Sequence, residues 1–408
     1  MKQTFPDGFY WGAATASYQV EGGIENTDWA EAAREGRVPE CGIACDHYHH
    51  YQEDFALAES LGHTAHRFSV EWARIEPREG EFDPAAIEHY RQVLTELRSR
   101  NLRPFITLWH FTLPDWFAKR GGFECTDAPQ LFARYCAYVV GELHDLCEEF
   151  STMNEPNVFA SNGWLRGTWP PFKRFTLTDR VSITNSGRQY EAAPERGLRP
   201  LLLYFRVLRH LAQAHNEAYR VIKVVAPAVS VSVVKHVIVF DANWNPFNKI
   251  KAWIANYYWT KKFMQRTYRS CDSIGLNYYF YTQFGDKRTW KKTDMDWNFA
   301  PGHIYDALRM LQPYGKPLFV SEAGLADADD SDRAEYITAQ VKAVHQAIAD
   351  GIEVQGHMYW SLLDNYEWAL GFDKRFGLIA VDFQTQKRTV RPSAYVYKKI
   401  CESNAVVE

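Results

Sequence analysis

The sequence contains no long apolar run. Although 46% of its 408 residues are hydrophobic, it has no stretch of about 18 apolar residues, the length that crosses a bilayer. The longest candidate, residues 221–234, is interrupted by Lys223 and Pro227. The first residues also lack the apolar stretch of a signal peptide. We therefore expect a protein without a transmembrane helix, and a reducing, cytoplasmic compartment is its default location.

Cysteine and net charge are both low. The seven cysteines are odd in number and irregularly spaced, which argues against a disulfide framework. The net charge is −4, so the overall charge gives no reason to expect binding to nucleic acid or to a membrane surface. We expect neither of these partners, and the sequence leaves open whether the chain forms a homo-oligomer.

The chain does contain a regular alternation of strand and helix patterns. Short apolar stretches typical of buried strands occur at 9–16, 65–72, 104–109, 149–154, 229–235, 272–279, 317–322 and 354–361. Helices are expected at 46–61, 84–100, 129–147, 199–223, 249–268, 302–312, 332–350 and 392–402, and a long loop at 170–198. No linker rich in Pro, Gly or Ser interrupts this pattern. The alternation predicts one α/β domain over residues 1–408, folded as a closed (β/α)8 TIM barrel.

Polar side chains gather where these predicted strands end. A strand that only packs in a core has no reason to end in polar residues so often. Barrels of this type carry their active sites at the C-terminal ends of the strands. We therefore expect the following residues to meet at one end of the barrel: Gln19, Arg67, His110, Asn154, Glu155, Asn277, Tyr279, Glu322 and Trp360.

Two glutamates in this set suggest a reaction. Taken alone, Glu155 could be a carboxylate at a helix N-terminus, and Glu322 could belong to a structural salt bridge. Taken together, two carboxyl groups from distant strand ends are what the hydrolysis of a glycosidic bond requires. The fourteen tryptophans also suit a sugar site, because the apolar face of a pyranose can lie on an aromatic ring.

Six motifs follow one another along the chain: residues 5–22, Asn-Glu-Pro (154–156), Asn-Tyr-Tyr (277–279), Ser-Glu-Ala-Gly (321–324), residues 360–368 and Lys-Arg-Phe-Gly-Leu (374–378). In these motifs, and over about residues 5–400, the chain resembles glycoside hydrolase family 1, the β-glucosidase and β-galactosidase group. Each motif is short, and the register of all six makes the resemblance specific.

The resemblance implies a role for each site residue, and it implies no cofactor and no metal. Glu155 would be the acid/base and Glu322 the nucleophile, with Arg67, Asn277 and Tyr279 supporting the two carboxyl groups. The residues that would hold or line the sugar subsite are Gln19, His110, Asn154, Trp360, Glu367, Trp368 and Phe376. The chain departs from the usual pattern at Met153, at Ala323-Gly324 and in His-Phe-Thr-Leu-Pro (110–114). These departures bear on sugar preference and leave the reaction class unchanged.

The predicted function is that of a retaining exo-β-glycosidase acting on small-molecule β-glucosides, with β-galactosides or β-fucosides also accepted. Retention requires the two carboxyl groups to lie about 5–5.5 Å apart. We expect Glu155 to have a raised pKa and to start protonated, and Glu322 to start as an anion near Arg67. A carboxylate at Glu367 would repel phosphate, which favours an unphosphorylated sugar. Two alternatives are a transglycosylase that uses the same glutamates and a non-catalytic glycan-binding barrel.

Two further segments allow more than one interpretation. Asp-His-Tyr-His-His-Tyr (46–51) could bind a metal, although it also fits the first helix, whose side chains would point in several directions. Residues 244–268 combine tryptophans with five Lys or Arg between Lys249 and Arg266, a pattern compatible with a membrane interface. The simpler expectation for this segment is a barrel helix whose apolar residues pack inward.

Overall fold

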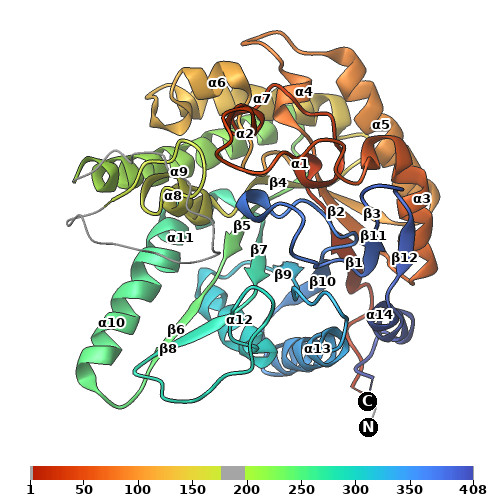
Figure 1. Ribbon diagram of the computed structural model, residues 1–408, viewed down its shortest axis with the longest axis vertical. Coiled ribbons are helices and arrows are strands. Elements are labelled where there is room, and N and C mark those ends of the chain that lie inside the picture. The colour runs from red at the N-terminus through yellow and green to blue at the C-terminus, as the bar shows by residue number, and fades with distance from the viewer. Residues whose placement is uncertain (1–2, 176–197, 408) are drawn as a thin grey trace.

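The computed structural model describes residues 3–175 and 198–407, in which a closed barrel of parallel strands surrounds the centre (Figure 1). The strand order around the barrel is β1-β10-β9-β7-β5-β4-β3-β2. Their bounds are β1 (Tyr10–Ala14), β2 (Ala65–Ser69), β3 (Arg103–Thr107), β4 (Glu149–Asn154), β5 (Ser230–His236), β7 (Ser273–Tyr278), β9 (Leu318–Ala323) and β10 (Val354–Trp360). The predicted TIM barrel is therefore confirmed. Most of the loop expected at 170–198 lies outside the described residues.

Helices follow the strands and form the outer layer of the barrel (Figure 1). The longer ones are α3 (His47–Ser60), α5 (Pro84–Ser99), α7 (Ala128–Leu143), α9 (Arg199–Val225), α10 (Pro246–Asn256), α13 (Arg333–Ala349) and α14 (Pro392–Ser403). The shorter ones are α1 (Ser17–Val20), α2 (Asp28–Arg34), α4 (Trp72–Ile75), α6 (Asp115–Lys119), α8 (Pro156–Trp164), α11 (Lys262–Thr267) and α12 (Ile304–Leu311).

Helix α5 illustrates how local sequence sets an element. The Asp83 side chain accepts a hydrogen bond from the Ala85 N–H at 2.8 Å, and Pro84 occupies the first turn, where no N–H is needed. The apolar residues predicted to share one face are all buried: Ile87, Tyr90, Val93, Leu94 and Leu97. Burial of this face holds the helix against the barrel.

The interior of the barrel is apolar toward the start of the strands. One small cluster joins side chains from different strands, namely Ala65, Phe105, Phe319 and Met358, with Tyr10 packed against it. The rings of Phe105 and Phe319 lie 5.6 Å apart. This packed layer closes one end of the barrel, which leaves the C-terminal ends of the strands for polar residues.

Four short strands were not predicted. Strands β6 (Val239–Ala242) and β8 (Tyr281–Phe284) pair in parallel, and β11 (Ile379–Val381) and β12 (Arg388–Val390) pair antiparallel. With three or four residues each, they are too short for alternation to be recognised in a sequence window. Strands β6 and β8 follow closely after β5 and β7, so this ribbon continues from the C-terminal ends of two barrel strands.

The prediction of one inward-packing helix at 249–268 is confirmed for its second part, where Phe263 and Met264 are buried, and is wrong for its first part. The segment consists of α10, a π-helical turn at Tyr257–Lys261 and α11. Within α10 only Ala252 is buried, and its large apolar side chains are exposed. The physical reason is that α10 packs against the β6–β8 ribbon through small and polar residues, which leaves its apolar residues facing outward.

Over the described part of the chain, no helix has the length and apolarity needed to cross a bilayer. All seven cysteines lie in that part and are free thiols, and six of them are buried. The fold is therefore held by packing and hydrogen bonds without covalent cross-links between cysteines.

Candidate active site

Glu155 stands at the junction between β4 and α8. Its backbone N–H donates to the carbonyl of Val234 in β5 at 3.0 Å, and Pro156 opens the helix that follows. The junction gives Glu155 a φ of 41°, a left-handed conformation that costs a non-glycine residue about 1 kcal/mol. The residue is only 6% exposed. The backbone is therefore strained at the residue whose carboxyl group is buried at the C-terminal end of the barrel.

Glu322 lies in β9, where it pairs with Asn277 of β7. Its Oε1 accepts a hydrogen bond from Nη1 of Arg67 at 2.5 Å, and its Oε2 accepts one from the hydroxyl of Tyr279 at 2.6 Å. Arg67 and Glu322 are both buried. A guanidinium on one oxygen and a phenol on the other are contacts that bind a carboxylate anion.

Two asparagines connect the glutamates. Asn277 Nδ2 donates to Glu155 Oε1 at 2.7 Å and to Asn154 Oδ1 at 3.2 Å. The same Asn154 oxygen accepts a hydrogen bond from Nη2 of Arg67 at 2.8 Å. A continuous chain of buried hydrogen bonds thus runs from Glu155 through Asn277, Asn154 and Arg67 to Glu322, so two residues far apart in sequence share one network.

The electrostatic environment separates the two carboxyl groups. Burial, and next the negative charge of Glu322, raise the pKa of Glu155 to about 8, against the opposing effects of the Asn277 hydrogen bond and of Lys235. A group with this pKa is largely protonated at neutral pH. The site therefore sets a buried carboxyl group with a raised pKa, that of Glu155, beside one that is paired with a guanidinium, that of Glu322.

Several buried polar atoms at this end of the barrel have no hydrogen-bond partner among the described residues. They include Gln19 Oε1, His110 Nδ1 and Glu367 Oε2. The amide of Gln19 is fixed by donating to the Tyr366 carbonyl at 2.7 Å. Burial, followed by the charge of Glu322, raises the pKa of Glu367 to about 8. Leaving buried polar atoms unpaired is costly, and the hydroxyl groups of a sugar could satisfy them.

Aromatic rings enclose these polar atoms. The imidazole of His110 is nearly parallel to two tryptophan rings, 5.9 Å from Trp360 at 17° and 6.1 Å from Trp368 at 12°. Burial, assisted by Arg67, holds the pKa of His110 well below its usual range, so the ring is neutral. His110 Nε2 also lies 3.1 Å from Asn154 Nδ2, which connects the aromatic wall to the network of the glutamates.

Phe376 forms a second wall. Its ring lies 6.2 Å from that of Tyr279 and 6.3 Å from that of Trp297. These residues, with Trp360, belong to a small apolar cluster that is distinct from the main core. The contacts described so far link ten of the twelve site residues expected from the sequence, and Gln19 bonds to the carbonyl of Tyr366, next to Glu367 in sequence.

Three residues of the site escaped the sequence analysis. Lys235 is fully buried and donates to Asn157 Oδ1 at 2.6 Å and to the His236 carbonyl at 2.7 Å. It ends a predicted strand, so the rule that found the other strand-end residues could have found it too. Trp297 and Trp169 (5.5 Å from Trp368) lie in loops, where no sequence pattern marks a residue for the site.

The histidines of residues 46–51 do not converge. His47 Nδ1 lies 2.7 Å from Asp54 Oδ2, and His49 Nδ1 lies 2.6 Å from Asp46 Oδ1. In the described ranges, no group of three His, Cys, Asp or Glu side chains is arranged to hold a metal ion. These side chains instead make contacts within α3 and with Asp46, the residue that precedes this helix.

Comparison with known proteins agrees with the site geometry. A family model described as glycosyl hydrolase family 1 matches residues 1–241 and 243–406. The chain is 28% identical to β-glucosidase A of Thermotoga maritima, with 98% of each chain covered. It is 30% identical to a β-galactosidase of Sulfolobus acidocaldarius, covering 99% of this chain and 96% of the relative.

Solved structures give the same result. A β-glycosidase from Pyrococcus horikoshii superimposes with a TM-score of 0.88 at 32% identity, covering 100% of this chain and 97% of the other. A β-glucosidase from Thermotoga maritima in complex with glucoimidazole gives 0.86 at 28% identity, covering 99% and 100%. The fold and the paired glutamates define a glycoside hydrolase built on a TIM barrel. The chain belongs to glycosyl hydrolase family 1 and is a β-glycosidase.

Proposed function

We propose that the protein is a retaining exo-β-glycosidase that hydrolyses unphosphorylated β-glucosides and also accepts β-galactosides. The observation that carries this proposal is the buried network that joins the two glutamates yet gives them different partners. Glu322 is held by a guanidinium and a phenol, whereas Glu155 has a single amide donor and a pKa raised to about 8.

In the first step, Glu322 attacks the anomeric carbon while Glu155 protonates the departing oxygen, which forms a glycosyl ester and releases the aglycone. Formation of the ester removes the negative charge of Glu322. Because that charge contributes to the raised pKa of Glu155, the pKa of Glu155 then falls. Glu155 can next accept a proton from water, which attacks the ester and releases the sugar with its original configuration.

Sugar preference follows from the polar atoms and rings of the subsite. Gln19, His110 and Glu367 offer unpartnered polar atoms to hydroxyl groups, and Trp360 and Trp368 offer apolar faces. Lys374 is the cation nearest in sequence to the loop that carries Glu367 and Trp368. Its ammonium group donates to the Asp294 carbonyl at 2.7 Å. Because Lys374 is already hydrogen-bonded to this carbonyl, its position supports an unphosphorylated substrate rather than a sugar phosphate. The names of the relatives, β-glucosidase and β-galactosidase, support both sugars.

The stereochemical course provides the test. An aryl β-glucoside is incubated with the enzyme, and the anomer of the released glucose is followed by NMR from the first turnover. We expect β-glucose first, with slow mutarotation afterwards; α-glucose as the first product would overturn the retaining mechanism. Free glucose as the main product separates hydrolysis from transfer, and no release across several aryl glycosides would favour a binding protein. The free thiols support the cytoplasmic location that we propose.

A further inference from the structure

Helix α10 is amphipathic, but its polar face points to the protein and its apolar face points outward, the reverse of an ordinary surface helix. Its small and polar stripe faces the protein: Asn248 Nδ2 donates to Asn243 Oδ1 at 2.9 Å, and Asn256 Nδ2 donates to the Phe240 carbonyl at 2.7 Å. Ala252, between these two asparagines, is the buried residue of the helix. A helix that packs on a protein core normally presents its apolar stripe to the core, so α10 is inverted.

The outward face of this helix is apolar and aromatic. Trp244, just before the helix, is 92% exposed, Phe247 is 73% exposed and Trp253 is 62% exposed. Phe247, Ile250, Ile254 and Tyr258 follow one another at helical spacing, and all are among the exposed large hydrophobic residues. Figure 1 shows α10 at the periphery of the molecule beside β6 and β8, where it continues into α11. Contiguous exposed apolar surface of this kind marks an interaction site.

The same surface is strongly basic. Residues 242–271 contain six Lys or Arg and no Asp or Glu, although the whole chain has a net charge of −4. The cations lie close to the aromatic rings: Lys249 Nζ is 5.4 Å from the centre of the Trp244 ring, and Lys262 Nζ is 4.4 Å from that of Phe205. Positive charge and exposed rings therefore occupy one surface.

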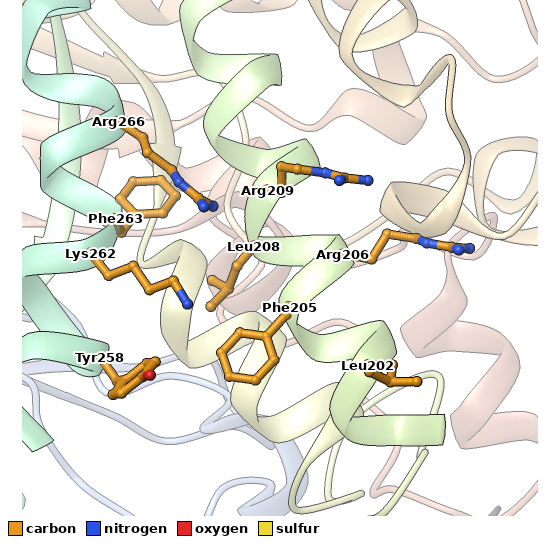
Figure 2. A pocket seen from close by; sticks show the side chains of 9 residues that line it. All are labelled: Leu202, Phe205, Arg206, Leu208, Arg209, Tyr258, Lys262, Phe263 and Arg266. Carbon is orange, nitrogen blue, oxygen red and sulfur yellow. The ribbon is translucent and has the colours of Figure 1, made fainter. Parts of the chain in front are cut away.

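A groove extends this surface toward α9. It has a volume of about 360 Å³ and is lined by apolar residues together with Arg206, Arg209, Lys262 and Arg266. Figure 2 shows Lys262 and Arg266 extending from the α11 side toward α9, which carries Arg206 and Arg209. Tyr258 belongs both to the groove and to the apolar stripe, so the two form one continuous surface.

We propose that α10 and this groove dock the enzyme on the surface of an anionic phospholipid bilayer. The exposed Trp, Phe and Ile side chains enter the headgroup boundary, and the Lys and Arg side chains contact lipid phosphates. Aromatic residues with neighbouring cations are typical of segments that lie at a membrane interface without crossing it. The proposal differs from the sequence expectation of no membrane contact, which rested on the net charge of the whole chain and on apolar residues that pack inward.

Other occupants fit the surface less well. A second copy of the chain would bring two patches rich in Lys and Arg together without any acidic partner in residues 242–271, and like charges repel. Nucleic acid would satisfy the charge but would leave Phe247, Ile250 and Ile254 without a hydrophobic partner. Anionic lipid matches the charged and the apolar features at once.

The proposed docking surface is joined to the barrel through the β6–β8 ribbon. The β6–β8 ribbon beneath α10 continues from the C-terminal ends of β5 and β7, and β7 carries Asn277 of the glutamate network. The outward orientation of the apolar face of α10 follows from the fold alone. The proposal therefore does not depend on which glycoside the enzyme cleaves.

Vesicle flotation tests the proposal on the full chain. Purified protein is mixed with phosphatidylcholine vesicles, with or without about one third phosphatidylglycerol, at low salt and at about 0.5 M salt. We expect flotation with the anionic vesicles at low salt and loss of most of it at high salt. Absence of flotation, or equal flotation with neutral vesicles, would overturn the proposal.

Matched variants locate the surface. The triple variant Phe247→Ser, Trp253→Ser, Ile254→Ser should weaken vesicle affinity by roughly tenfold or more, as should the double variant Lys249→Glu, Lys251→Glu. The control, Ile43→Ser, Val224→Ser, Tyr395→Ser, removes exposed apolar residues elsewhere and should bind as the wild type does. An equal loss in the control would contradict the assignment to α10.

Two further measurements guard against misinterpretation. Thermal unfolding followed by circular dichroism should give the same midpoint for all variants, which shows that they fold, whatever their enzymatic activity. Sedimentation without lipid should show one and the same species for wild type and triple variant. A dimer that the triple variant abolishes, or retention on nucleic acid that persists in that variant without flotation, would show that the surface serves a different partner.

Discussion

Glu155 and Glu322 are the same type of residue at the ends of two barrel strands, β4 and β9, that are separated by β5 and β7, yet their surroundings differ. Glu322 has a donor on each oxygen, one of them the cationic Arg67. Glu155 has only an amide donor, and burial together with the charge of Glu322 raises its pKa to about 8. In the proposed mechanism the partners set the roles: the carboxyl group that is paired with Arg67 acts as the anion, and the other carboxyl group keeps the proton.

Removing the anion should have the largest effect. We expect Glu322→Gln to lower kcat for an aryl β-glucoside on the order of 10⁵-fold, because the group that forms the bond to the anomeric carbon is lost. Glu335→Gln, an exposed carboxyl group on α13, is the matched control and should leave kcat unchanged. A residual rate within about tenfold of the wild type would show that Glu322 is not the nucleophile.

Removing the proton donor should give a loss that depends on the leaving group. Glu155→Gln should lower kcat/KM on the order of 10³-fold for a poor leaving group such as an alkyl alcohol. It should cost far less for an activated phenol such as dinitrophenol, which leaves without protonation. A loss of equal size for both leaving groups would contradict the acid role.

The pH profile sharpens the same comparison. Because the pKa of Glu155 is raised to about 8, the acid is present below that pH and is lost as the pH rises through it. The wild-type kcat/KM for a poor leaving group should therefore fall above pH about 8. This alkaline limb should be absent in Glu155→Gln. A wild-type profile that stays flat well above this pH would count against the assignment.

Removing the cation of Arg67 should make the surroundings of the two glutamates more alike. Arg67→Met deletes both the ion pair with Glu322 and the hydrogen bond to Asn154. We expect a loss in kcat of about 10²-fold, and a destabilisation of about 3–5 kcal/mol because a buried carboxylate is left unpaired. Arg67→Lys, which keeps the charge, should recover part of both, as measured by kinetics and by thermal unfolding. Full activity in Arg67→Met would mean that the ion pair is dispensable.

The smallest effect is expected from Tyr279→Phe. This change removes one hydrogen bond to Glu322 and keeps the ring that packs against Phe376. A hydrogen bond to a charged group contributes about 1.5–3 kcal/mol. Because Arg67 still pairs with Glu322 in this variant, we expect the lower end of that range, a fall in kcat/KM of roughly tenfold. Tyr281→Phe is a control, because the hydroxyl of Tyr281 bonds to Asp241 outside the network. If both variants lost equally, the effect would not come from Glu322.

The barrel could be predicted because its signals are local. Each barrel strand is a short apolar stretch, and α5 has both a cap and an apolar face, so residues close in sequence suffice to define them. The twelve candidate site residues could be proposed because they end strands or lie in motifs that resemble a known family. Strands β6, β8, β11 and β12 were missed since three or four residues carry too little pattern. Trp297 and Trp169 were missed because loops have no periodicity.

The sequence by itself determined the order of strands and helices and the types of side chain at the strand ends, because both depend on neighbours along the chain. The tertiary structure decided which of two glutamates receives Arg67, and that Lys235 lies buried beside Asn157. It also decided that α10 turns its apolar stripe outward, a choice that periodicity cannot make. The reason is physical: burial, charge and hydrogen bonding act between atoms close in space, and the fold brings together segments that are far apart in sequence.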